Sequence, residues 1–176
     1  MHIYTGKGFV EQASDFDLRS PKGAFIGWLL NNRSAQHMYD FANFIGVVYP
    51  VPPDELHATI CYAPDARLDQ TLFGDHPLPM PVELNHHNRP VTRILGKPGS
   101  RGALVTAYDS DQLYARHRYW QDQGLEHTFP GFLCHVTLSY DSSAQDPEVV
   151  KRLIRCPCSL PVVFDRERIA VPNPSY

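Results

Sequence analysis

Two short segments contain the residue types best suited to catalysis. Residues 56–62 read Leu-His-Ala-Thr-Ile-Cys-Tyr, and residues 134–140 read Cys-His-Val-Thr-Leu-Ser-Tyr. Each contains His-x-Thr followed by an apolar residue, with a Tyr five positions after the His. Both segments alternate and are rich in β-branched residues, which predicts strands. Because side chains alternate across a strand, each His shares a face with the Thr two positions later.

Two imidazole–hydroxyl pairs are suited to phosphodiester cleavage. One imidazole can remove a proton from the attacking hydroxyl while a second, protonated imidazole supplies one to the departing oxygen. Threonine hydroxyls can donate hydrogen bonds to the non-bridging oxygens, where charge grows in the transition state. A single His-x-Thr is most often a partly exposed strand residue with no catalytic role. Two matching copies favour a catalytic set, which we predict to be His57, Thr59, His135 and Thr137.

Zinc is the main alternative use of these histidines. The available ligands are His57, His135, His86 and His87. The chain has neither His-x-x-x-His nor a Cys/His cluster of known spacing, and Cys156 and Cys158 are too close together for an ordinary disulfide. We therefore predict a reaction without a metal or other cofactor.

The elements that position the motifs occur twice. Residues 22–30 read as a strand, residues 34–46 as a helix with Ser34 as N-cap, and the first motif strand follows. Residues 102–108 read as a strand, residues 109–124 as a helix starting at Asp109, and the second motif strand follows. Ala24 precedes His57 by 33 residues and Ala103 precedes His135 by 32, which indicates an internal duplication.

The predicted fold class is α+β and bilobal, with two mostly antiparallel sheets and flanking helices around a central cleft. At 176 residues we expect one domain. Its lobes are predicted at about 22–80 and 81–165, with an N-terminal arm at 1–21 and a C-terminal tail at 166–176. A third helix is predicted after Asp146 as N-cap, followed by a closing strand at 160–164.

Charge and composition restrict the partners. The net charge of −3 argues against a general nucleic-acid coat or an anionic membrane surface as partner, and no apolar stretch is long enough to span a bilayer. Four cysteines without a disulfide pattern favour a reduced cytoplasm. Residues 84–108 lack acidic side chains but contain a recurring series of cations, Arg89, Arg93, Lys97 and Arg101. This series is either a solvated strand–loop face or a rim that attracts a small phosphorylated ligand.

The paired His-x-Thr motifs in a duplicated α+β chain resemble the 2H phosphoesterase superfamily, over residues 22–164. Within it the chain looks most like the phage anti-CBASS phosphodiesterases, which degrade the cyclic di- and trinucleotides that bacteria use as antiviral signals. The resemblance implies metal-independent hydrolysis of 3′–5′ linkages beside a 2′-hydroxyl. It makes His57 and His135 the acid–base pair and Thr59 and Thr137 the phosphate-holding hydroxyls. It also implies a phage protein acting in the host bacterial cytoplasm.

Three further site residues follow only from the resemblance. An acidic residue near the C-terminus is expected to assist, for which Glu167 is the candidate, and aromatic residues are expected to line the cleft, for which Phe25 and Trp28 are candidates. Both aromatic residues also fit a hydrophobic core. Two other functions remain: a 2′,3′-cyclic phosphodiesterase or 2′-5′ RNA ligase-like enzyme acting on RNA ends, and a module that sequesters a nucleotide without cleaving it.

Overall fold

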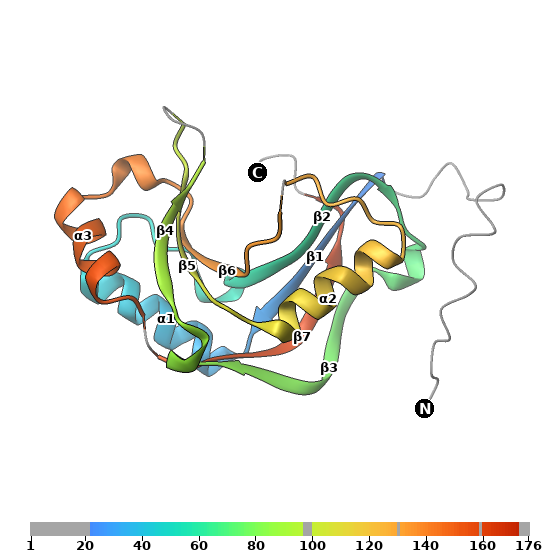
Figure 1. The fold of residues 1–176 in the computed structure, drawn as a ribbon, viewed down its shortest axis with the longest axis horizontal. Coiled ribbons are helices and arrows are strands. Elements are labelled where there is room, and N and C mark those ends of the chain that lie inside the picture. Colours follow the sequence, from blue (N-terminus) through green and yellow to red (C-terminus); the bar gives the residue numbers. More distant parts are fainter. Residues whose placement is uncertain (1–21, 97–99, 130, 159, 173–176) are drawn as a thin grey trace.

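The computed structural model describes residues 22–96, 100–129, 131–158 and 160–172. Within these ranges the chain is α+β, as predicted, and Figure 1 shows its strands and α-helices. The elements are β1 (Lys22–Leu30), α1 (Asn32–Ile45), β2 (His57–Arg67), β3 (Gly74–Leu84), β4 (Val91–Leu95), β5 (Ala103–Ala107), α2 (Asp111–Asp122), β6 (His135–Ser139), α3 (Pro147–Arg155) and β7 (Val162–Ala170).

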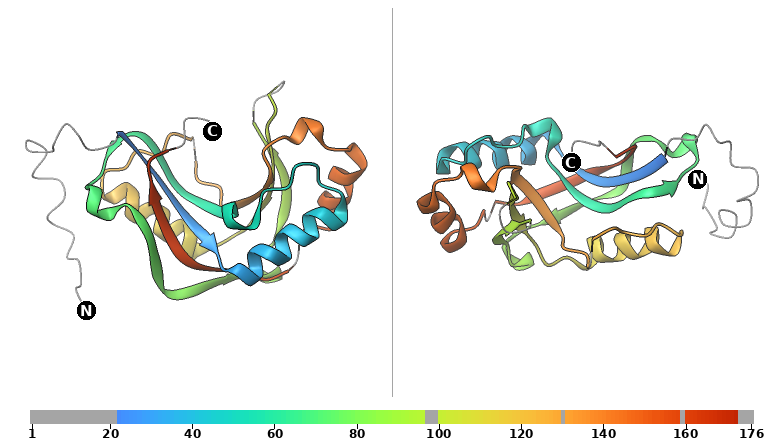
Figure 2. Two further views of the ribbon diagram at one scale, coloured as in Figure 1. Left: turned by 180° about the vertical axis from the view of Figure 1, so that it is seen from behind. Right: turned by 90° about the horizontal axis from the view of Figure 1, so that it is seen from above.

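The described strands form one antiparallel sheet in the order β3-β7-β1-β2-β6-β5-β4. The two motif strands meet at its centre, where β2 and β6 are joined through one residue pair, Ala58 with Val136. The prediction of two separate sheets was therefore wrong, because this central pairing makes the two halves arms of a single sheet. The arms twist away from each other on either side of the central pair (Figures 1 and 2).

The predicted duplication is visible in the order of the elements. Each half of the sheet contains a strand–helix–motif strand unit, β1-α1-β2 or β5-α2-β6. Helix α2 lies against β2 of the other half, whereas α1 contacts β1 and β7 of its own half as well as β6 and α3 (Figure 2). These contacts across the centre of the sheet tie the two units together.

The ends of the helices follow from their capping residues. Helix α1 has Asn31 as its N-cap, whose side chain accepts a hydrogen bond from the backbone N–H of Ser34 at 2.8 Å. Ser34 was predicted as this cap, but its hydroxyl instead accepts from the Val163 backbone N–H at 3.0 Å. Helix α2 is capped by Ser110 and not by Asp109. Helix α3 has the predicted Asp146 cap.

The hydrophobic core lies between the helices and one face of the sheet. Alternate residues of β1, β2 and β6 point into it, among them Ile26, Ile60 and Leu138, each at most 1% exposed. The helices contribute buried residues to the other side of the core: Met38 from α1, Leu113 from α2 and Leu153 from α3. Because strand side chains alternate, the other face of the same strands carries the motif histidines and threonines.

The C-terminal boundary differs from the prediction. Strand β7 continues to Ala170 and pairs with β1 and β3, so residues 166–170 belong to the sheet and not to a tail. The predicted arm at 1–21 lies outside the described residues. No helix in the described ranges is long and apolar enough to cross a membrane.

Candidate active site

The two His-x-Thr motifs lie side by side at the centre of the sheet. His57 is the first residue of β2 and His135 is the first residue of β6. Ala58 pairs with Val136 in antiparallel register, which places His57 level with Thr137 and Thr59 level with His135. All four side chains share the sheet face that points away from the helices. The motifs are thus related by a pseudo-two-fold axis through the Ala58–Val136 pair.

Spacing across this pair suits a phosphodiester. Directly opposite residues on antiparallel strands have Cβ atoms about 4.5–5.5 Å apart, and diagonal neighbours are about 7–8 Å apart. His57 and His135 are diagonal neighbours, and each has the threonine of the other motif beside it. Thr137 is 8% exposed and Thr59 is half-buried. A phosphorus atom between the histidines would have one imidazole on each side.

Each imidazole is oriented by the backbone in the same way. The Nδ1 atom of His57 lies 2.7 Å from the carbonyl oxygen of Glu55, and Nδ1 of His135 lies 2.7 Å from that of Leu133. A carbonyl oxygen only accepts hydrogen bonds, so these contacts assign the proton to Nδ1 in both rings. The atom left to exchange a proton with a substrate is therefore Nε2 in both cases.

Burial favours the neutral form of both rings. It lowers the pKa of His57 below 6.5, and the nearby His135 and Arg168 lower it further, against the opposing effect of the hydrogen bond to Glu55. Burial likewise lowers the pKa of His135, against its hydrogen bond to Leu133. Burial thus favours the form of each ring that acts as a base, and the ring that acts as the acid must acquire its proton first.

Phe25 is the only one of the three resemblance-based candidates that contacts a motif histidine in the described structure. Its ring meets the His57 imidazole edge-on, with centroids 5.2 Å apart and planes at 90°. Gly27 makes room for this arrangement, because a Cβ there would lie 2.8 Å from Cζ of Phe25 and 3.5 Å from Cδ2 of His57. Phe25 therefore holds the ring of His57 from the β1 side.

Trp28 and Glu167 lie on the opposite, helix-covered face of the sheet. Trp28 is 5% exposed, and its Nε1–H donates to Oε2 of Glu167 at 2.9 Å. Glu167 is 4% exposed, and its carboxylate accepts hydrogen bonds from Nε and Nη2 of Arg116, a residue of α2. The structure thus places these two candidates in a buried polar contact between the sheet and α2, apart from the histidines.

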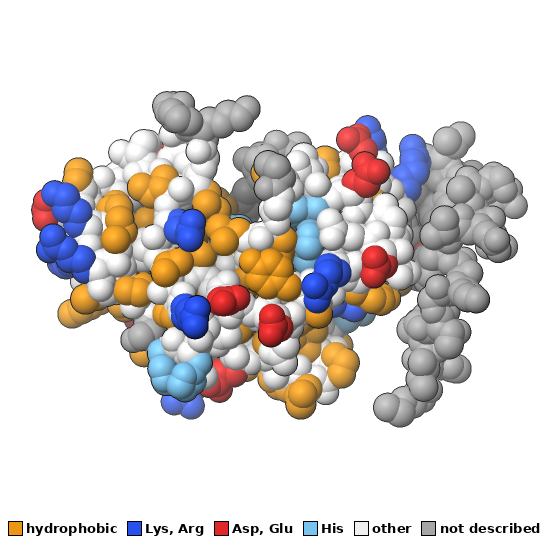
Figure 3. Space-filling view, viewed as in Figure 1, with side chains coloured by type: hydrophobic (Ala, Val, Ile, Leu, Met, Phe, Trp, Pro, Cys, Tyr) orange, Lys and Arg blue, Asp and Glu red, His pale blue; other side chains and the backbone are white. Residues whose placement is uncertain are grey.

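The predicted basic series is spread over several places. Arg93 on β4 pairs with Val105 of β5, which pairs with Thr137, so these three residues share the face of the site. Arg89 is the left-handed C-cap of the short helix η3 (His86–Asn88), and Lys97 lies outside the described residues. Basic and acidic side chains are interspersed on the face shown in Figure 3 and do not form one basic surface.

The sequence analysis missed the arginines of β7. Arg166 pairs with Leu29, which pairs with His57, and Arg168 pairs with Gly27, which pairs with Thr59. Both arginines therefore lie on the face of the site, and Arg168 forms a two-contact ion pair with Asp75 at 2.7 and 2.8 Å. The alternating pattern Arg-Glu-Arg, with the arginines on one face of a strand, was the available signal.

The histidines do not form a metal site in the described part of the chain. His86 and His87 lie together on η3, with ring centroids 3.8 Å apart. Across the described ranges no three His, Cys, Asp or Glu side chains are arranged to hold an ion. The proposed zinc set of His57, His135, His86 and His87 is accordingly not assembled. The geometry offers two proton-transfer groups and two hydroxyl donors.

Comparisons with known proteins identify a family for the chain. The family model described as "Anti-CBASS protein Acb1" matches residues 22–171. The chain is 27% identical over 157 residues to an anti-CBASS protein Acb1 of Escherichia phage RB16, covering 89% of this chain and 84% of that protein. It is 32% identical over 118 residues to an Acb1 protein of Yersinia phage phiR1-RT, covering 67% of each. Among solved structures, Escherichia coli LigT complexed with ATP has a TM-score of 0.52 at 12% identity, covering 85% of this chain and 86% of LigT.

Proposed function

The chain belongs to the anti-CBASS protein Acb1 family, and we propose that it is a metal-independent phosphodiesterase that opens cyclic di- or trinucleotide immune signals at their 3′–5′ linkages. Family membership and the fold shared with LigT support a phosphoesterase-type hydrolase with an anti-CBASS role. The cyclic oligonucleotide as substrate and the absence of a metal from the reaction are the parts that we propose.

One observation carries the proposal: two imidazoles, each with Nδ1 bound to a backbone carbonyl at 2.7 Å, stand on either side of a pseudo-two-fold axis. The Nε2 atom of one ring takes the proton from a ribose 2′-hydroxyl as its oxygen attacks the adjacent phosphorus. The bond from phosphorus to the 5′-oxygen breaks, and Nε2–H of the other ring protonates that leaving oxygen. The ring is opened, leaving a 2′,3′-cyclic phosphate and a 5′-hydroxyl.

The same groups serve the second half of hydrolysis. A water replaces the 5′-hydroxyl and attacks the phosphorus, and the bond from phosphorus to the 2′-oxygen breaks. The two histidines exchange roles: the former acid takes a proton from the water, and the former base protonates the 2′-oxygen. In both steps Thr59 and Thr137 donate hydrogen bonds to the non-bridging oxygens, where negative charge accumulates. Because the strands hold these donors before the substrate arrives, little reorganisation is needed at the moment of reaction.

The decisive experiment offers the purified protein several substrates in excess EDTA. The panel contains 3′,3′-cyclic dinucleotides, a cyclic trinucleotide and an RNA ending in a 2′,3′-cyclic phosphate. His57→Ala and His135→Ala should each lower turnover by at least 100-fold, since general acid–base catalysis contributes about 10²–10⁴. His37→Ala, an exposed histidine on α1, is the matched control and should keep wild-type turnover.

The outcomes separate the candidate functions. Cleavage of the rings in EDTA supports the proposal. Turnover of the RNA end alone would instead favour the RNA-processing enzyme, and complete loss of activity in EDTA would overturn the metal-free mechanism. Tight binding without turnover of any substrate would indicate a sequestering module.

A further inference from the structure

The edge of β2 that faces the second half of the sheet is paired with β6 at a single residue. Ala58 pairs with Val136, and beyond this pair the two arms of the sheet diverge (Figure 1). The backbone groups that follow on this edge, at Ile60 and Tyr62, are therefore out of reach of β6. Unpaired backbone groups in the interior are strongly disfavoured, so other parts of the chain must supply their hydrogen-bond partners.

Two histidines outside the motifs supply these partners. Nδ1 of His117, on α2, lies 2.7 Å from the Ile60 carbonyl oxygen, and Nδ1 of His127 lies 3.0 Å from the Tyr62 nitrogen. The backbone N–H and the hydroxyl of Thr128 both donate to the Tyr62 carbonyl oxygen, at 3.0 and 3.2 Å. Groups from α2 and from the segment that precedes β6 thus take the place of a neighbouring strand.

The two imidazoles use Nδ1 in opposite ways. The Ile60 carbonyl only accepts, so His117 carries a proton on Nδ1, whereas the Tyr62 N–H only donates, so Nδ1 of His127 carries none. The two rings meet edge-on, with centroids 4.9 Å apart and planes at 81°. Burial, together with the nearby His117 and His135, lowers the pKa of His127 to about 4. Near pH 7 this ring is therefore neutral, as its hydrogen bond from Tyr62 requires.

The ring of His117 also holds the residue that precedes Leu133. Phe132 stacks on His117 with centroids 4.3 Å apart and planes at 11°, and it meets the ring of Tyr114, also on α2, edge-on at 5.1 Å and 82°. The neighbouring Leu133 carbonyl accepts the 2.7 Å hydrogen bond from Nδ1 of His135. A continuous series of contacts therefore runs from the edge of β2, through His117 and Phe132, to the peptide that orients the His135 ring.

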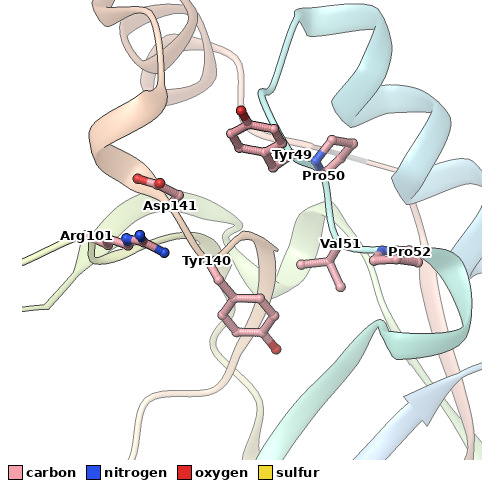
Figure 4. Close-up of a pocket in the computed structure, with 7 residues that line it drawn as sticks. All are labelled: Tyr49, Pro50, Val51, Pro52, Arg101, Tyr140 and Asp141. Atoms are coloured by element: carbon pink, nitrogen blue, oxygen red, sulfur yellow. The ribbon is translucent and has the colours of Figure 1, made fainter. Parts of the chain in front are cut away.

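The segment that precedes His57 is supported by its own backbone. It contains prolines at positions 50, 52 and 53, which restrict its conformation. The Glu55 N–H donates to the Pro52 carbonyl oxygen at 3.0 Å at the start of the short helix η1 (Pro53–Glu55), and the Val51 N–H donates to β6 at Leu138 at 2.9 Å. Figure 4 shows this segment across a pocket from the end of β6. The Glu55 carbonyl that orients His57 thus belongs to a hydrogen-bonded turn.

The segment that precedes His135 is supported differently. Its described residues, 125–129 and 131–134, form no helix or strand. Phe132, the residue next to the orienting carbonyl, is placed by its ring contacts with α2. The two motifs are related by pseudo-symmetry, but only the second depends on side-chain contacts of this kind for the orientation of its histidine.

We propose that His117 and His127 are positioning residues for His135: they join the edge of β2 to α2 and to the segment before β6, and so fix the carbonyl that orients the His135 ring. The inference rests on the proposed function, since it gives these two histidines a part in the acid–base reaction through His135 and not through contact with the substrate. Their loss should disturb one motif histidine and spare the other.

Nitrogen-15 NMR of the histidine rings tests the proposal without a substrate. At pH 8, well above the lowered pKa values of both motif histidines, the shift of each ring nitrogen reports whether it carries a proton. The wild type should show His57 and His135 protonated on Nδ1. In His117→Ala and in Phe132→Leu, a change at a half-buried position, His135 should become a mixture of tautomers while His57 keeps its proton on Nδ1. An unchanged His135 in both variants, or equal changes in the two motif histidines, would overturn the proposal.

Turnover supplies a second readout. A misoriented His135 should lower kcat by roughly 10- to 100-fold in His117→Ala and Phe132→Leu and change KM by less than about twofold, since both residues act through His135. Val149→Ala, a buried change on α3, is the control for lost stability and should keep wild-type kcat at a temperature where all variants are folded. An equal loss of kcat in Val149→Ala, or a raised KM with unchanged kcat in the other two variants, would contradict a positioning role.

Two replacements of His127 separate its hydrogen bond from its bulk. His127→Asn retains an oxygen that can accept from the Tyr62 N–H, and should keep the His135 tautomer and kcat within about threefold of the wild type. His127→Leu retains bulk without an acceptor, and should alter both as His117→Ala does. Equal behaviour of the two variants would refute the part assigned to His127. If the wild type cleaves none of the cyclic nucleotides, the proposed function fails, but the tautomer of His135 still decides the positioning role.

Discussion

Replacing Arg116 with Met should destabilise the protein much more than it changes catalysis. Arg116 donates through Nε and Nη2 to the carboxylate of Glu167, whose side chain is 5% exposed, whereas that of Arg116 is 31% exposed. Burial lowers the pKa of Arg116, but the hydrogen bond and the charge of Glu167 outweigh this and raise the pKa above its usual range. The pair joins α2 to β7, and Trp28 donates to the same carboxylate.

The two sides of this ion pair should respond differently to mutation. Arg116→Met keeps most of the apolar stem but leaves a buried carboxylate without its charge partner, which costs about 3–5 kcal/mol. Glu167→Gln leaves an acceptor for Trp28 and a guanidinium that water can reach, so its cost should be nearer the roughly 1.5–3 kcal/mol of a hydrogen bond to a charged group. For a domain of this size the larger loss lowers Tm by about 6–20 °C.

Urea denaturation followed by circular dichroism measures these losses. The matched control is Arg168→Met, which breaks a similar two-contact pair with Asp75 at 41% and 34% side-chain exposure, and should cost at most about 1 kcal/mol. At a temperature where it remains folded, Glu167→Gln should keep kcat within about threefold, because the carboxylate faces away from the histidines. A wild-type Tm together with a 100-fold loss of kcat in Glu167→Gln would refute this assignment and return Glu167 to the chemistry.

Three further predictions concern the site and its scaffold. The plot of kcat/KM against pH should be bell-shaped, because the base is inactive below its pKa and the acid is inactive above its pKa. Its maximum should lie below pH 6.5, since burial lowers the pKa of both His57 and His135. A maximum above pH 7.5 would contradict this. Gly27→Ala should lower kcat about tenfold with little change in Tm, since the added Cβ displaces the Phe25 ring and the His57 ring. Adding Phe25→Leu to this variant should restore part of the lost kcat. An unaffected kcat in Gly27→Ala would show that the ring contact is dispensable. Asp146→Ala should cost about 1 kcal/mol in urea denaturation through the lost cap of α3 while leaving kcat unchanged, and a changed kcat would contradict a purely structural cap.

Local signals account for the elements that the sequence predicted well. Alternation and β-branched residues marked β1 with its observed bounds, Lys22–Leu30, and placed β2 and β6 on the two motifs. The Asp-Pro pair at residues 146–147 marked the start of α3 because both residues act within the first turn. The α1 and α2 caps were misplaced by one to three residues, because Asn31, Ser34, Asp109 and Ser110 are all capable of capping and packing decides among them.

Some residues of the candidate site could also be predicted from local signals, and others could not. The motif His and Thr residues were found from the sequence because residue type and strand alternation already put them on one face. Trp28 and Glu167 could not be assigned to a face, since a shift in register lies between Ile26 and Gly27 of β1 and another between Leu29 and Leu30 in its pairing with β7. One such shift moves every later side chain to the other face of a strand.

The sequence by itself determined the duplication, the α+β class and the paired motifs on which the proposed chemistry rests, since each depends on residue type and short-range spacing. Only the tertiary structure decided that one sheet joins the halves through Ala58 and Val136, and which histidine nitrogen is free. It also decided that Arg168 lies on the face of the site and Glu167 behind it. These features arise from contacts between residues distant in the chain. They depend on register and packing, which no local pattern encodes.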